Sequence, residues 1–127
     1  MQSYLLVAAG GAIGATARYG ASILVGHFWR TPFPVATMLI NILGSLAMGL
    51  LVGYLVRTLP PWQNEARLFI AVGILGGFTT FSAFSLDVVT LLERSELAAA
   101  ALYALVSVVL SVAALFVGLF IFRMAAP

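Results

Sequence analysis

The ten charged residues of this chain, six arginines and four acids, are spaced so that long apolar segments lie between them. These segments cover residues 3–28, 34–56, 67–92 and 97–123, and Arg18 and Asp87 are the charged residues that fall inside them, away from their ends. Each segment reaches the length of about 20 mostly apolar residues that an α-helix needs to cross the hydrocarbon core of a bilayer. We therefore predict an all-α membrane protein with four transmembrane helices in one domain, residues 1–127.

The composition excludes several classes of protein. Hydrophobic residues make up 63% and charged residues 8% of the chain, against about 45–50% and about 25% in ordinary soluble domains. A soluble enzyme and a disordered chain do not have this composition. The chain has no lysine, and its arginines are scattered, so we expect no nucleic-acid partner. It has no cysteine and one histidine, which leaves no nucleophile–base pair for an enzyme.

The arginines show little preference for one side of the membrane. With four spans both termini lie on the same side, together with Arg57, Arg67 and Arg123, while Arg30 and Arg94 lie on the other. Membrane orientation follows the Lys/Arg bias of short loops, and here that bias is almost absent. This balance favours dual topology, in which copies insert in both orientations and pair antiparallel. The simpler alternative is a single orientation with the termini inside.

The first span combines small residues with a charge. Gly10, Gly14 and Arg18 are four residues apart and share one helix face. The Gly10–Gly14 pair forms a GxxxG pattern, which lets two helix backbones approach closely. Arg18 lies about 15 Å of helix from the end of the span, and a charge at that depth costs about 2.5–3.5 kcal/mol. Its side chain either extends to the headgroups or lines a water-filled vestibule.

Two other spans carry polar side chains at four-residue intervals, which places each set on one helix face. The sets are Thr37, Asn41 and Ser45 in the second span and Tyr103, Ser107 and Ser111 in the fourth. Amides and hydroxyls buried in lipid must find hydrogen-bond partners. They either bond between helices to hold a bundle together or line a polar pathway.

The third span contains a segment that disfavours a continuous helix. Gly76 and Gly77 are followed by a run of Thr and Ser, all poor helix formers. We predict an unwound turn over residues 76–80, ahead of the alternative of an unbroken helix with a small-residue face. Such backbone is tolerated in a membrane only when it is buried in protein or lines a wet cavity. Phe81 and Phe84 follow on one side, and their positive ring edges can approach an anion; ordinary contact with lipid is the alternative.

Several of these segments together resemble the motifs of a known family. Residues 76–85, which read GGFTTFSAFS, closely resemble the signature of the CrcB/Fluc fluoride channels. The Gly10–Gly14 segment with Arg18 and Tyr19, the 41–45 segment and the polar face of the fourth span agree with it. The resemblance covers essentially the whole chain. Ala83 departs from the family, which often has Thr there.

The resemblance implies an antiparallel homodimer in the cell (inner) membrane, with two pores that are each lined by both subunits. Fluoride would pass the ring edges of Phe81 and Phe84, the amide of Asn41 and the hydroxyls of the fourth span, those of Tyr103, Ser107 and Ser111. We also include Arg18, Thr37, Thr80 and Ser82 in the expected pathway. A structural Na⁺ ion at the dimer centre would be held by the backbone carbonyls of Gly76 and Thr79.

The implied function is passive release of cytoplasmic fluoride, which enters as neutral hydrogen fluoride and ionises inside the cell. The main alternative is a small dual-topology multidrug or cation exporter. Such an exporter needs a carboxylate inside the membrane, and the first span has none. We interpret Asp87, two turns before the end of the third span, as an acid that extends to the interface or caps a helix.

The balance of arginines predicts that both orientations occur in one membrane. Reporters fused to the C-terminus and active on only one side of the membrane should therefore give signal on both sides. Two lysines added to the tail should shift insertion toward one orientation. A strongly one-sided signal from the unmodified chain would contradict dual topology.

Overall fold

The structure, a computed structural model, describes residues 1–125 and consists there of helices joined by short connections. The long helices are α1 (Gln2–Phe28), α2 (Val35–Thr58) and α6 (Leu97–Met124). Between α2 and α6 the chain forms a composite helix. Its parts are α3 (Gln63–Ala66), a π-helix η1 (Arg67–Leu75), α4 (Gly76–Phe78) and α5 (Phe81–Glu93).

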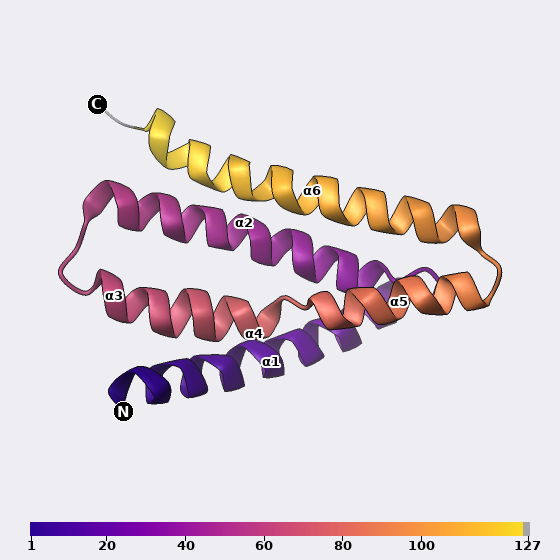
Figure 1. The fold of residues 1–127 in the computed structure, drawn as a ribbon, viewed down its shortest axis with the longest axis horizontal. Coiled ribbons are helices and arrows are strands. Elements are labelled where there is room, and N and C mark those ends of the chain that lie inside the picture. Colours follow the sequence, from indigo (N-terminus) through magenta and orange to yellow (C-terminus); the bar gives the residue numbers. More distant parts are fainter. Residues whose placement is uncertain (126–127) are drawn as a thin grey trace.

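These elements make four antiparallel passes through the bundle, and the two ends of the described chain lie at the same end of it (Figure 1). Within residues 1–125, three passes are long and apolar enough to cross a membrane: α2, the composite helix of 31 residues, and α6. At 27 residues α1 has the length but is less apolar, because it contains Arg18 together with several glycines and polar residues. The predicted all-α membrane class is confirmed.

The connections end the helices by local backbone chemistry. Pro32 and Pro34 separate α1 from α2, and Pro34 stands directly before the first residue of α2. Leu59 ends α2 in the left-handed region, with φ 45°, and the two prolines that follow it cannot continue a helix. The connection between α5 and α6 turns at Ser95, with φ 59°. All three connections are short, so consecutive passes are neighbours.

Close packing joins α1 to the first half of the composite helix. A Cβ atom added at Gly10 would overlap the carbonyl oxygen of Phe69, and one at Gly14 would overlap that of Ile74. A Cβ at Gly77 would lie 2.8 Å from the carbonyl oxygen of Gly11. The GxxxG pattern therefore brings two backbones together, as predicted, and Gly77 serves the same contact.

A second close contact joins α2 to α6. A Cβ atom at Gly49 would overlap the carbonyl oxygen of Leu115, and one at Gly118 would lie 2.6 Å from the backbone nitrogen of Leu50. Both glycines are buried. Without side chains at these points the two backbones come within van der Waals contact, which is how membrane helices associate without a hydrophobic driving force.

The predicted break in the third span is confirmed, but it is narrower than predicted. Gly76 and Gly77 are helical, and only Thr79 (ψ 155°) and Thr80 (φ −151°, ψ 119°) are extended. The expectation that the glycines unwind the helix was wrong, because at least Gly77 is needed for close packing on α1. The π-helix η1 before the break is not predicted by the sequence analysis.

The close contact of α1 predicts a position-specific effect of added methyl groups. Gly14→Ala should lower the free energy of unfolding by about 1–3 kcal/mol, the usual cost of overpacking, because its Cβ meets backbone that cannot move aside. Gly20→Ala is the matched control on the same helix, since nothing lies within 4 Å of its added Cβ. Thermal unfolding in detergent measures both, and equal stability of the two variants would contradict the packing.

Candidate functional site

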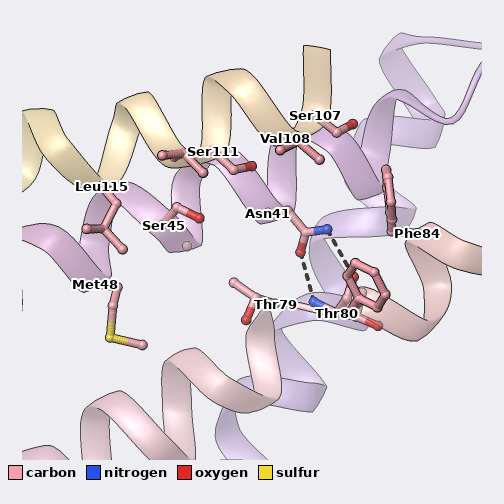
Figure 2. A pocket seen from close by; sticks show the side chains of 13 residues that line it. Asn41, Ser45, Met48, Thr79, Thr80, Phe84, Ser107, Val108, Ser111 and Leu115 are labelled. Carbon is pink, nitrogen blue, oxygen red and sulfur yellow. Dashed lines mark hydrogen bonds between the residues drawn. The ribbon is translucent and has the colours of Figure 1, made fainter. Parts of the chain in front are cut away.

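A cavity of about 390 Å³ lies where α2, the break, α5 and α6 meet. Its polar lining consists of Asn41, Ser45, Thr79, Thr80, Ser107 and Ser111, and its apolar lining includes Phe81, Phe84 and Met48. Figure 2 shows these side chains around the break. The described residues that line the cavity are all uncharged. It therefore offers hydroxyls, an amide and ring edges to a ligand, and no carboxylate.

Asn41 closes a ring of two hydrogen bonds with the backbone of Thr80. The Thr80 N–H donates to Asn41 Oδ1 at 2.8 Å, and Asn41 Nδ2 donates to the Thr80 carbonyl oxygen at 3.0 Å. Both bonds are drawn in Figure 2. They connect α2 to the break across 39 residues of sequence. The side chain thus replaces helical hydrogen bonds that the backbone of Thr80 lacks.

The threonine side chains satisfy other groups at the break. Thr79 Oγ1 and the Thr79 N–H both donate to the Leu75 carbonyl oxygen, at 2.8 and 3.0 Å. Thr80 Oγ1 accepts a hydrogen bond from the Ala83 N–H at 3.1 Å and so caps the N-terminus of α5. This run of hydroxyl residues therefore ends one helix and begins the next.

These bonds also divert donors from two carbonyl groups. In an unbroken helix the Thr80 N–H would donate to the carbonyl of Gly76, and the Ala83 N–H to the carbonyl of Thr79. Here they donate to Asn41 Oδ1 and Thr80 Oγ1 instead. The carbonyl oxygens of Gly76 and Thr79 lose their helical donors and are free to bind another group.

Ser107 carries a buried hydroxyl without a partner. The residue is 4% exposed, and its Oγ is the one buried side-chain oxygen or nitrogen within residues 1–125 that makes no hydrogen bond. It lines the cavity one turn before Ser111. A buried polar group without a partner costs about 1–3 kcal/mol, so this hydroxyl is available to bond a group that enters the cavity.

The two phenylalanines of the predicted pathway both line the cavity. Their ring centroids are 5.5 Å apart with 42° between the ring planes. Phe84 is half-buried, whereas Phe81 is 77% exposed in the single chain. Phe81 thus forms an outer edge of the cavity on the surface of the single chain.

Tyr103 lies behind Phe84 and does not line the cavity. It is fully buried, and its hydroxyl donates to Asp87 Oδ2 at 2.9 Å. Its ring centroid is 5.2 Å from that of Phe84 and 5.6 Å from that of Phe33. Asp87 therefore accepts a hydrogen bond between α5 and α6, where we expected an interfacial or capping acid.

Three other residues of the predicted pathway lie outside the cavity wall. Thr37 is one turn before Asn41 on α2, Ser82 is exposed with its Oγ 3.2 Å from Thr80 Oγ1, and Arg18 is half-buried on α1. Ser45, Met48 and apolar residues of α6 also line the cavity, although they are not part of the predicted pathway. Ser45 belongs to the polar face of the second span, but the apolar residues carry no signal that separates them from lipid-facing ones.

Comparison with known proteins identifies the family. Residues 5–119 match the model of the family described as CrcB-like protein, Camphor Resistance (CrcB). The chain belongs to this CrcB family. It is similar to the fluoride-specific ion channel FluC of Hyphomonas neptunium, with 53% identity over 97% of both chains. Similar relatives are FluC of Rhodospirillum centenum (50% identity, 98% of both chains) and FluC 2 of Nitrobacter hamburgensis (50%, 95% of this chain and 97% of the relative).

The bond between Tyr103 and Asp87 predicts a stability effect in this CrcB protein. Tyr103→Phe keeps the ring against Phe84 but removes the donor to Asp87, so the free energy of unfolding should fall by about 1–3 kcal/mol. Asp87→Asn keeps an acceptor and should cost less. Thermal unfolding of both variants checks this, and an unchanged Tyr103→Phe protein would contradict it.

Proposed function

We propose that this chain is a fluoride-selective channel that lets cytoplasmic fluoride leave the cell passively and so reduces fluoride toxicity. The observation that carries the proposal is about 50% identity, over nearly the full chain, to relatives named fluoride-specific ion channels. These relatives are channels, not enzymes. The alternative of a multidrug or cation exporter receives no support from them.

The chemistry of the cavity fits an anion that sheds its hydration shell. Ser107 and Ser111 can donate hydroxyl hydrogens, and Ser107 has no other partner. Asn41 uses one of its two amide hydrogens on Thr80, and the second remains for a ligand. The positive edges of Phe81 and Phe84 add attraction without a formal charge. We assign Thr80 to the same wall, and Arg18, Thr37 and Ser82 to its approaches. Tyr103 does not line the cavity and contributes to the pathway by packing its ring against Phe84.

We propose that the working form is an antiparallel homodimer with two pores, in the cell (inner) membrane. Two features of the single chain support this. The outer edge of the cavity, at Phe81, is 77% exposed, so a second copy is needed to enclose a polar pathway. The arginines of the connections are also nearly balanced between the two faces, which permits both orientations.

We further propose a structural Na⁺ ion between the two subunits, held by the carbonyls of Gly76 and Thr79. Both carbonyls have lost their helical donors, and no group of three or more His, Cys, Asp or Glu residues occurs in the described chain. Neutral oxygens suit a monovalent hard cation, whose single charge needs no carboxylate. Two subunits would supply four carbonyls, and the bound cation would hold the subunits together.

The function is tested by measuring fluoride release with an electrode. The purified protein is placed in liposomes that are loaded with potassium fluoride, and the electrode records fluoride in the outside solution. Addition of valinomycin should start rapid release of fluoride, whereas chloride from matched liposomes should stay inside. Release that does not exceed that of protein-free liposomes would refute the channel. Uptake of a cationic dye driven by a proton gradient, without fluoride release, would favour the exporter.

Because the Ser107 hydroxyl has no partner in the chain, its removal should lower fluoride transport without lowering protein stability. Ser107→Ala removes a buried group that bonds nothing in the chain, so the free energy of unfolding should stay equal or rise. Fluoride flux should fall about tenfold, the effect of about 1.4 kcal/mol. Ser22→Ala on α1, whose hydroxyl bonds its own helix, is the control with unchanged flux. Normal flux in Ser107→Ala would remove this hydroxyl from the pathway.

A further inference from the structure

Asn41 is engaged by the protein before any ion arrives. Its Oδ1 accepts from the Thr80 N–H and its Nδ2 donates to the Thr80 carbonyl. An amide has two N–H donors and one carbonyl oxygen, so the ring with Thr80 leaves only one N–H. A side chain that served solely as an anion donor would not need both of these bonds.

The first of these bonds controls the Gly76 carbonyl. If Oδ1 of Asn41 were absent, the Thr80 N–H would be unpaired in a lipid environment, where each unsatisfied backbone group costs several kcal/mol. Its nearest helical acceptor is the carbonyl of Gly76, four residues earlier. Asn41 therefore keeps the Thr80 N–H occupied and the Gly76 oxygen free.

The second bond controls the start of α5. The Thr80 carbonyl is held by Asn41 Nδ2, and the Thr80 side chain caps α5 through the Ala83 N–H. Phe81 is the first residue of α5, and Phe84 follows one turn later. The position of Thr80 therefore sets where both rings enter the cavity.

We propose that Asn41 is a positioning residue that couples the cation site to the anion pathway through the backbone of Thr80. This inference rests on the proposed function, since it makes Asn41 responsible for the geometry of both the proposed fluoride pathway and the proposed sodium site. The same two bonds keep the Gly76 carbonyl available to a cation and fix the helix that carries Phe81 and Phe84. The competing interpretation is that Asn41 contacts only the anion.

Hydrogen exchange tests the anchor without reference to either ion. In the unmodified protein in detergent, the Thr80 N–H should exchange slowly although the residue is not helical, because Asn41 protects it. Asn41→Ala should speed this exchange about tenfold or more, the effect of one net hydrogen bond. Thr58→Ala, a control on the same helix whose hydroxyl bonds Tyr54, should leave it unchanged. Fast exchange at Thr80 in the unmodified protein would overturn the proposal even if Asn41→Ala failed to fold.

Thermal unfolding in sodium chloride and in N-methylglucamine chloride tests the coupling. The unmodified protein and Thr80→Ala, which keeps both backbone bonds to Asn41, should be stabilised by sodium. Asn41→Ala should lose most of that stabilisation together with fluoride flux. Loss of flux with the full sodium effect retained would overturn the coupling and leave Asn41 as an anion ligand only. No sodium effect in the unmodified protein would remove the cation site, and with it the coupling, whereas absence of fluoride flux there would refute the proposed function.

Discussion

The structure depends on an interruption of a membrane helix at which side chains bond the displaced backbone N–H groups. At Thr79 and Thr80 the chain is extended inside a span, where water is scarce and unpaired backbone groups are costly. The side chains of Asn41 and Thr80 take over the hydrogen bonds of backbone groups that the helix gives up. The interruption therefore frees the carbonyl groups of Gly76 and Thr79, while the N–H groups of Thr80 and Ala83 stay bonded.

The break also lets the third span change partners. Its first half, η1 and α4, packs along α1, whereas its second half, α5, packs on α6 (Figure 1). The glycine contacts hold α1 to η1 and α4, and α2 to α6. The cavity lies at the change of partner, where α2 and α6 face the start of α5. Rigid packing on both sides thus positions a short stretch of irregular backbone.

The sequence predicted the helical class, the break and most of the polar cavity lining because each has a local signal. Charges delimit spans, runs of Thr and Ser disfavour helices, and residues four apart share a face. It did not predict that Gly76 and Gly77 stay helical, because glycine has the same low helix propensity whether it breaks a helix or packs closely on a neighbour. It also did not predict that Tyr103 bonds within the chain whereas Ser107 lines the cavity, since the periodicity gives a shared face and not the partners of each side chain.

The difference in side-chain length decides what each of these two buried residues can do. Tyr103 is long enough to reach Asp87, and its hydroxyl is satisfied within the chain. Ser107, one turn later, is too short to reach across, so its hydroxyl remains unpaired beside the cavity. A lone chain in lipid would leave this hydroxyl unsatisfied and the outer ring of Phe81 exposed. The single chain therefore leaves one polar group of the cavity unsatisfied. In the antiparallel dimer that we propose, a second copy would close the cavity around an ion that this hydroxyl can bind.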